Sequence, residues 1–243
     1  RYHTSYGGGV YMVKGAAVRN CRITENAAAR CGGAVYLDGG GELTNCYVFK
    51  NQAKGIGLTD GYGGGVFVEQ EGTVRNCMLI ENAASIGAGM MLNHDRTRYP
   101  QSNTGEAYFS NALAPIAVGC VIVNNTATTE AGGIAMVSGG TANHLTVVRN
   151  HCAGNSVTIN KRPYGRAVGL YIDIGAAVFN SVVWGNTNNT NSKTQYAAYA
   201  PTTSTAGEGV KPYLNFTAVA NYDQTEWTGT INIGVIGLNT DNN

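Results

Sequence analysis

The residues best suited to catalysis lie in two segments that depart from the pattern of the rest of the chain, residues 94–115 and 153–166. The first segment contains Asp95 and Arg96, and the second contains Lys161 and Arg162. Polysaccharide lyases use a Lys or Arg side chain as the base, often with Ca²⁺ held by carboxylates, so these residues would suit a carbohydrate-active enzyme. No carboxylate cluster completes such a site, and basic loop residues are by default solvated. We therefore assign no catalytic residue.

A second group of residues could bind sugars through aromatic rings and adjacent carboxylates. In three places a carboxylate stands two residues after a ring, so both side chains would share one face of a β-strand. Rings stacked along such a face can also simply stabilise a parallel sheet. Asp38 and Glu69 could reach the separation of a retaining glycosidase pair, but a flat face lacks a cleft. The binding candidates are Tyr11, Tyr36, Asp38, Phe67, Glu69, Tyr171 and Asp173.

Composition excludes several other classes of protein. The formal net charge of +1 lacks the excess of positive charge that attracts the phosphates of nucleic acid. The six Cys and four His show no spacing typical of zinc, so we expect no metal centre and no cofactor. No apolar run approaches the length of roughly 18 residues that a membrane-spanning helix needs. A charged fraction of 13% and 34 glycines argue against a helical bundle.

An internal repeat organises the chain from about residue 6 to residue 187. A glycine-rich motif with alternating apolar residues occurs six times, and a second motif ending in asparagine follows each copy. The spacing between the two motifs is the same in five copies, as from Gly9 to Cys21, and an insertion between His94 and Pro115 lengthens the other. An uninterrupted repeat is about 24–25 residues long, which is within the range of solenoid repeats. The six asparagines are Asn26, Asn51, Asn82, Asn125, Asn150 and Asn186.

The apolar residues of each repeat alternate, as at Val10 and Met12, which indicates short β-strands. A unit this short, without a helix or a hairpin dipeptide, can only stack each strand on the same strand of the next unit. The sequence therefore predicts an all-β parallel solenoid of about six recognisable coils, about 4.8 Å apart, with three strands per coil. We expect a single domain over residues 1–243, with regular coils at 6–187 and a loop-rich C-terminal part at 188–243 that has strands near 213–220 and 228–238.

Stacking places equivalent residues of successive coils in columns. In the asparagine column each side-chain amide can form hydrogen bonds with the backbone and with the asparagine of the next coil. A second column contains Cys21, Cys46, Cys77 and Cys120, whose side-by-side arrangement suits packing better than the torsion of a disulfide. We therefore predict four buried free thiols. His144 stands where other coils have Asn, which predicts a turn residue rather than a catalytic base.

The repeats resemble those of known families. Gly-Gly-Ala-Val at residues 32–35, together with Ile-Thr-Glu-Asn at 23–26, resembles the repeats of chlamydial polymorphic outer-membrane proteins, although aliphatic residues replace the Phe of their Phe-x-x-Asn motif. Asn-Ser-Val-Val-Trp-Gly-Asn at 180–186 is similar to coil ends in right-handed parallel β-helix proteins on the surface of Bacteroidetes. The resemblance implies a right-handed parallel β-helix at a bacterial surface.

We expect a surface-exposed or secreted, adhesin-like bacterial module, a rigid rod that binds glycan or protein. The alternative is a carbohydrate-active enzyme, a polysaccharide lyase or glycoside hydrolase, with its site beside the inserted segments; Ca²⁺ would be a cofactor only for a lyase. We expect no nucleic-acid partner and no membrane span. Because a solenoid end exposes unpaired backbone, we also expect neighbouring coils or capping elements in a longer parent protein.

Overall fold

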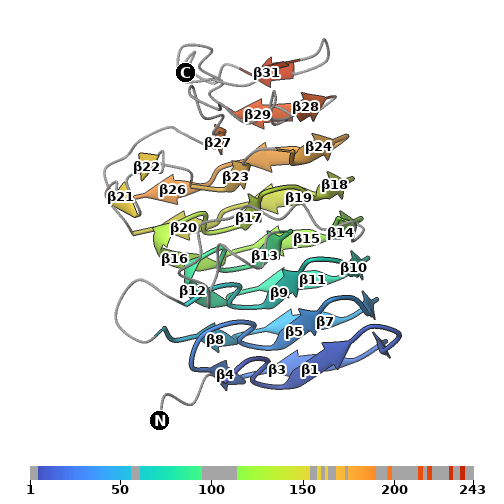
Figure 1. The fold of residues 1–243 in the computed structure, drawn as a ribbon. Helices are drawn as coiled ribbons and strands as arrows, with labels where there is room; N and C mark the ends of the chain where they lie inside the picture. The colour runs from blue at the N-terminus through green and yellow to red at the C-terminus, as the bar shows by residue number, and fades with distance from the viewer. Residues whose placement is uncertain are drawn as a thin grey trace.

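Every regular element in the described part of the chain is a β-strand, so no helix there could cross a membrane. Strands pair in parallel with their counterparts one repeat later, and Figure 1 shows the coils stacked from the N-terminal to the C-terminal end. The protein is a right-handed parallel β-helix, as the sequence predicted. The computed structural model describes residues 5–55, 61–94, 114–153, 158–159, 162–163, 168–172, 175–189, 196–198, 213–215, 218–220, 230–231 and 236–238.

The first coil contains four strands rather than the three that the sequence predicted: β1 (Val10–Val13), β2 (Ala17–Arg19), β3 (Arg22–Thr24) and β4 (Ala27–Ala28). The fourth strand has only two residues, which is too short for an alternating pattern. It forms because the backbone after Asn26 stays in register with the next coil, where the Gln52 N–H donates to the Asn26 carbonyl at 2.9 Å.

Equivalent strands of successive coils form four parallel sheets, named here sheets 1 to 4 in chain order. Sheet 1 contains β1, β5 (Val35–Asp38), β9 (Val66–Glu69), β13 (Met90–Asn93), β17 (Ile134–Val137), β23 (Leu170–Ile172) and β27 (Tyr196–Ala198). Sheet 2 contains β2, β6 (Glu42–Thr44), β10 (Thr73–Arg75), β14 (Ile116–Val118), β18 (Thr141–Asn143), β24 (Ala177–Phe179), β28 (Tyr213–Asn215) and β30 (Thr230–Ile231).

Sheets 3 and 4 complete each coil. Sheet 3 contains β3, β7 (Tyr47–Phe49), β11 (Met78–Ile80), β15 (Val121–Val123), β19 (Thr146–Val148), β25 (Val182–Trp184), β29 (Ala218–Ala220) and β31 (Ile236–Leu238). Sheet 4 contains β4, β8 (Gln52–Ala53), β12 (Ala83–Ile86), β16 (Thr126–Glu130), β20 (His151–Cys152) and β26 (Thr187–Asn188). The remaining pair, β21 (Thr158–Ile159) and β22 (Arg162–Pro163), is antiparallel.

The register of sheets 1, 2 and 3 is continuous along the solenoid, whereas in sheet 4 the pairing of β12 with β16 shifts between Ala84 and Ile86. Met90 pairs with Val66 on one side and with Ile134 on the other, although the long inserted segment lies between β13 and β14 in the chain. Strands β27 to β31 extend sheets 1, 2 and 3 beyond residue 187, where the repeat motif is no longer recognisable. Of these, β28 to β31 fall in the two C-terminal segments that were predicted to contain strands.

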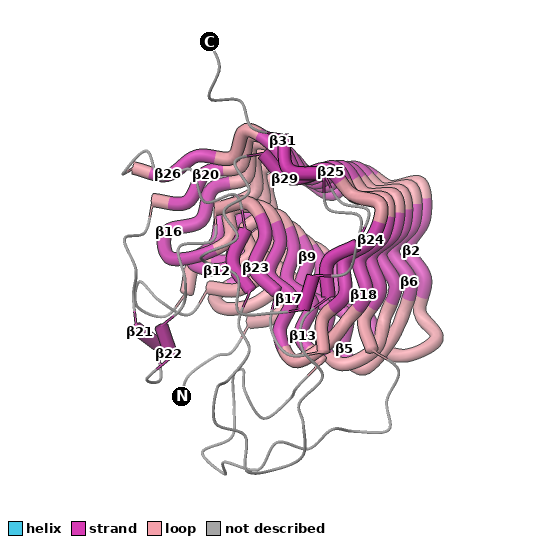
Figure 2. Tube along the Cα trace, turned by 90° about the horizontal axis from the view of Figure 1, so that it is seen from above, coloured by secondary structure: helices cyan, strands magenta, loops and turns pink. Residues whose placement is uncertain are grey.

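Two hydrophobic clusters lie on opposite faces of sheet 1. The main core fills the interior of the coils with aliphatic columns such as Val35, Val66 and Met90. Figure 2, seen from above, shows sheets 1, 2 and 3 around this interior, with sheet 4 beside them. The second cluster contains Cys31, Tyr36, Tyr62, Phe67, Ile86, Met91, Ala131, Ala135, Val137 and Tyr171.

Residues with left-handed backbone make the corner between sheets 2 and 3. Asn20, Asn45, Asn76 and Asn180 have φ between 47° and 56°, a region in which Asn is favoured among residues with a side chain. His144 occupies the same corner with a φ of 53°, which confirms it as a turn residue.

The predicted asparagine ladder is present and mostly buried. The Asn82 Oδ1 accepts hydrogen bonds from the backbone N–H and the Nδ2 of Asn51, both at 3.0 Å. The Asn82 Nδ2 donates to the Asn125 Oδ1 at 3.0 Å and to the Val48 carbonyl at 3.1 Å. Equivalent side-chain bonds link Asn26 to Asn51, Asn125 to Asn150 and Asn150 to Asn186. The ladder joins the described coils between β3 and β26 along one corner.

Candidate functional site

The aromatic residues of sheet 1 stack as the strand register predicts. The rings of Tyr11 and Tyr36 are 5.4 Å apart between centroids, and those of Tyr36 and Phe67 are 5.3 Å apart and almost parallel. The Tyr11 hydroxyl donates a hydrogen bond to Asp38, and the Tyr36 hydroxyl donates to Glu69. Each of these two tyrosine rings thus contacts the ring of the next coil, and each tyrosine hydroxyl bonds the carboxylate two residues beyond that ring.

The same face is closed to solvent beyond the first coil, which corrects the expectation of an open aromatic strip. Tyr11 is 50% exposed, whereas Tyr36 is 4%, Phe67 0% and Tyr171 2% exposed, and Glu69 is buried too. The reason is the second hydrophobic cluster, in which residues outside sheet 1 pack with these rings: Cys31, Tyr62, Ile86 and Ala131. Tyr36, Phe67 and Tyr171 therefore cannot present their ring faces to a sugar in this structure, and Asp38 is only partly exposed.

The catalytic candidates fall almost entirely outside the described residues. Asp95, Arg96, Lys161 and the binding candidate Asp173 lie there, and Arg162 is placed only as the first backbone position of β22. The described residues therefore do not test the lyase or glycosidase alternative. Within the described ranges, no group of three or more His, Cys, Asp or Glu side chains could hold a metal ion.

A partly exposed aromatic pair lies instead on the outer face of sheet 3, where the sequence analysis did not place a site. Tyr47 and Phe49 flank the buried Val48 in β7, and their ring centroids are 5.6 Å apart. The Arg22 guanidinium lies over the Tyr47 ring at 5.4 Å, and the Lys50 Nζ lies over the Phe49 ring at 4.8 Å. We call these four residues the aromatic patch. The signal was present in the sequence, since residues alternating with an inward column must point outward.

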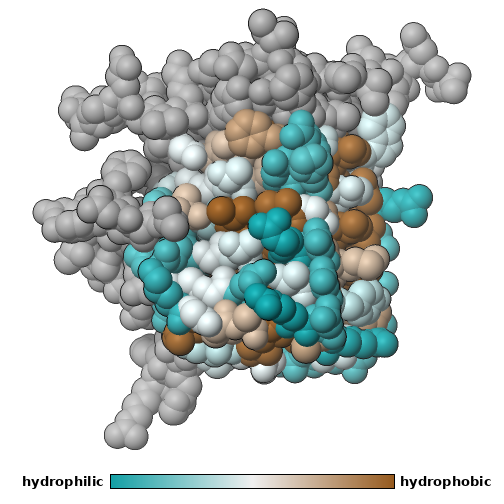
Figure 3. Space-filling view, turned by 90° about the vertical axis from the view of Figure 1, so that its right-hand side faces the viewer, coloured by the Kyte–Doolittle hydropathy of each residue, from teal (hydrophilic) through white to brown (hydrophobic). Residues whose placement is uncertain are grey.

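Apolar side chains continue the aromatic patch along the outside of sheet 3. Met78 is 44% exposed and Val182 is 40% exposed, although both are large hydrophobic residues. In Figure 3, which faces sheet 2, hydrophobic residues gather toward the right-hand edge, where sheet 3 begins. We call the following residues the outer strip: Tyr47, Phe49, Met78, Ile80, Val121, Val123, Val148, Val182 and Trp184.

Charged residues border the outer strip at the corner toward sheet 4. Glu25, Lys50, Glu81 and Arg149 occupy equivalent left-handed positions, one per coil. Lys50 and Glu81 are in neighbouring coils, and the Lys50 Nζ lies 3.8 Å from a Glu81 carboxylate oxygen. Both side chains are about half exposed, so this ion pair adds little to stability and remains able to contact a ligand.

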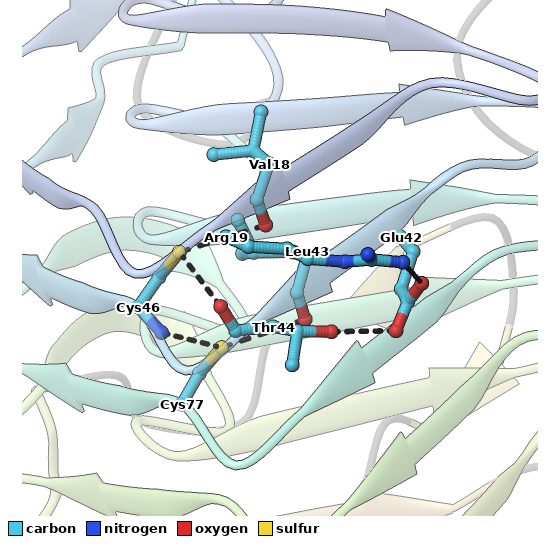
Figure 4. A network of polar contacts seen from close by, with 7 residues as sticks. All are labelled: Val18, Arg19, Glu42, Leu43, Thr44, Cys46 and Cys77. Atoms are coloured by element: carbon cyan, nitrogen blue, oxygen red, sulfur yellow. Dashed lines mark hydrogen bonds and ion pairs between the residues drawn. The ribbon is translucent and has the colours of Figure 1, made fainter.

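The outer face of sheet 2 is more polar near its N-terminal end. Arg19 donates to the Glu42 carboxylate at 2.7 Å, and the Thr44 hydroxyl donates to the other Glu42 oxygen at 2.7 Å (Figure 4). The Thr44 hydrogen bond, followed by the Arg19 contact, holds the pKa of Glu42 below its ordinary value. Both carboxylate oxygens of Glu42 thus already accept hydrogen bonds within this cluster.

The cysteine column lies between sheets 2 and 3, and Cys46, Cys77 and Cys120 are buried in it; Figure 4 shows the first two. The Cys46 Sγ contacts the Thr44 carbonyl at 3.2 Å, and the Cys77 Sγ accepts the Cys46 N–H at 3.4 Å. Burial raises the pKa of Cys46, and the neighbouring Cys120 thiol together with burial raises that of Cys77. All six cysteines are free, as was predicted for the four of this column. The prediction that all four are buried was wrong for Cys21, which is exposed because no described coil covers it.

Comparison with protein-family models, with curated proteins and with solved structures found no match to this chain. The functional argument therefore depends on the geometry of the described residues.

Proposed function

We propose that this chain is the rod of a surface-exposed or secreted, adhesin-like bacterial β-helix module that binds a partner through the outer strip. The observation that carries the proposal is the aromatic patch, in which the partly buried rings of Tyr47 and Phe49 lie beside the exposed side chains of Arg22 and Lys50. Tyr, Phe, Met and Arg are the residues enriched in protein interfaces, and binding energy concentrates on aromatic and Arg side chains.

The arrangement of the rings favours a protein over a glycan as the partner. A sugar stacks on an open ring face, but the two rings face each other, with Arg22 over one and Lys50 over the other. The patch also continues into aliphatic residues, including Met78 and Ile80. A flat apolar strip bordered by both signs of charge suits a polypeptide segment with apolar anchors.

The test uses a random-peptide phage library selected on the immobilised chain, because such a library samples many combinations of apolar anchors at once. We expect peptides enriched on the wild type to fall to background on a Tyr47→Ser and Phe49→Ser double variant. The matched control is Ile116→Ser, which removes an exposed apolar side chain from sheet 2. Circular dichroism verifies that each variant remains folded.

Two outcomes would count against this proposal. Equal enrichment on the wild type and on the Tyr47 and Phe49 variant would show that the outer strip is not the binding face. If the wild type bound glycans on an array and the same double variant did not, the partner would be a carbohydrate rather than a protein.

A further inference from the structure

The cysteine thiols inside the solenoid are potential metal ligands that the proposed function does not use. Cys46, Cys77 and Cys120 occupy successive coils, are at most 2% exposed and belong to the main core. Their backbones are in register, because the Met78 N–H donates to the Cys46 carbonyl and the Val121 N–H donates to the Cys77 carbonyl, both at 2.9 Å. Equivalent sulfur atoms are therefore separated by about 4.8 Å, the spacing of the coils.

Cys77 and Cys120 are joined by a hydrogen bond between their side chains, and we call them the thiol pair. This hydrogen bond holds the pKa of Cys120 below its ordinary value and raises that of Cys77, so the two sulfur atoms share a proton. The Cys46 N–H is a second donor to the Cys77 Sγ, at 3.4 Å (Figure 4). Hydrogen bonds of this kind favour a sulfur atom that has lost its proton.

The spacing of the thiol pair fits an ion held by two sulfur atoms in a line. A zinc–thiolate bond is about 2.3 Å long, so two such bonds end to end span about 4.6 Å, close to the coil spacing. Zinc itself takes four ligands, and the thiol pair offers only two. The backbone carbonyls that contact the two sulfur atoms, such as those of Arg75 and Val118, already accept backbone N–H groups at 3.0 and 2.9 Å. The site therefore suits an ion that is content with two ligands.

We propose that the thiol pair binds one soft monovalent metal ion of the copper(I) class between the Cys77 and Cys120 sulfur atoms. Thiolate ligands favour soft ions such as copper(I). The ion replaces the proton shared by the two sulfur atoms, and that proton leaves to solvent. One thiolate and one thiol then hold a single positive charge, so the buried site stays neutral and avoids the cost of burying a net charge. This inference is independent of the proposed binding function.

The test measures copper(I) retention in a chain whose exposed thiol has been removed by Cys21→Ser, so that this surface thiol does not contribute. The chain is unfolded in urea and refolded without oxygen in the presence of copper(I) supplied as its acetonitrile complex, because buried groups are reached only when the coils open. After desalting we expect one copper ion per chain. X-ray absorption should show two sulfur neighbours around the copper in a linear arrangement.

Two matched variants each remove one buried cysteine from the Cys21→Ser chain. Cys120→Ser breaks the thiol pair and should lower the affinity for copper(I), measured by competition with bicinchoninate, by about tenfold or more. Serine already occupies this column at Ser181, so we expect the fold to persist. Cys152→Ser removes a buried thiol outside the column and should leave the affinity unchanged. Circular dichroism verifies that each variant regains its β-sheet spectrum.

Three results would overturn the proposal. Copper could be absent from the refolded and desalted Cys21→Ser chain, or Cys120→Ser and Cys152→Ser could bind it equally well. X-ray absorption of the intact thiol pair could show nitrogen or oxygen neighbours, or more than two sulfur neighbours. This last measurement needs no substitution in the thiol pair, so it decides the proposal even if Cys120→Ser fails to fold.

Discussion

Each buried ladder asparagine satisfies backbone and side-chain groups in two neighbouring coils. Replacing Asn82 by Leu removes the acceptor of two Asn51 donors and the donor for the Val48 carbonyl and the Asn125 Oδ1. We expect the free energy of unfolding in urea to fall by about 3–5 kcal/mol, because each buried polar group left unsatisfied costs about 1–3 kcal/mol. The exposed Gln52, replaced by Leu, should change it by less than about 0.5 kcal/mol. Equal effects of the two substitutions would show that the ladder contributes no stability.

The cysteines should differ in reactivity in a way that follows their burial. At neutral pH we expect a thiol reagent to modify one of the six cysteines, Cys21, with mass spectrometry locating the modification. The buried thiols react only when the chain opens. A second fast-reacting cysteine in the folded protein would contradict the packing of the column.

The raised pKa values of Cys46 and Cys77 also predict the effect of pH. The folded state holds these thiols protonated, so their contribution to stability is complete below the ordinary thiol value of 9.0 and is lost as pH rises above it. The melting midpoint should therefore fall on the alkaline side of pH 9. A Cys46→Ser and Cys77→Ser variant should show a smaller fall, since Ser181 already occupies this column without titrating.

At the scale of the element, both faces of sheet 1 are buried beyond the first coil, each by its own hydrophobic cluster. Phe67 packs in the second hydrophobic cluster and stacks on Tyr36, so Phe67→Ala should lower the free energy of unfolding by about 3–5 kcal/mol. Tyr11→Ala, at the exposed end of the same stack, should cost about 1 kcal/mol. Chemical denaturation measures both, and a similar small loss for Phe67 would show that the second cluster is loosely packed.

The whole molecule should tolerate loss of one repeat, because each coil contacts only its neighbours. Deleting residues 26–50 joins Glu25 to Asn51 and removes one full period, which preserves the register of all four sheets. We expect the β-sheet circular dichroism spectrum to persist, with a urea m-value lower by roughly a sixth. Deleting residues 26–45 instead joins Glu25 to Cys46 and takes β1, β2 and β3 out of register with the later coils, so we expect the first coil to be lost from the solenoid and the m-value to fall further. Equal m-values for the two deletions would show that register does not hold the coils together.

Much of the fold follows from spacing within one repeat. Coils stack at a fixed separation, so a residue meets its counterparts in the repeats before and after it, and alignment of the repeated motifs places Asn51 against Asn82 and Cys46 against Cys77. Strand alternation likewise assigns Tyr36 and Phe67 to the face opposite Val35 and Val66. These relations are local in the repeat, and so the sequence by itself determined the parallel β-helix, the ladder and the stacking of the rings.

What covers each face was decided only by the tertiary structure. Alternation states that Tyr36 and Phe67 share a face, but burial depends on where the segments carrying Tyr62 and Ile86 lie relative to sheet 1. The same limit left Tyr47 and Phe49 unrecognised, since their outward direction was readable and their exposure was not. Cys21 differs from Cys46 because no described coil lies on its outer side. The alternation of side chains is a property of a single strand and can be read from its sequence. Solvent exposure depends on how elements far apart in the repeat are placed against each other, and the spacing of residues does not contain that information.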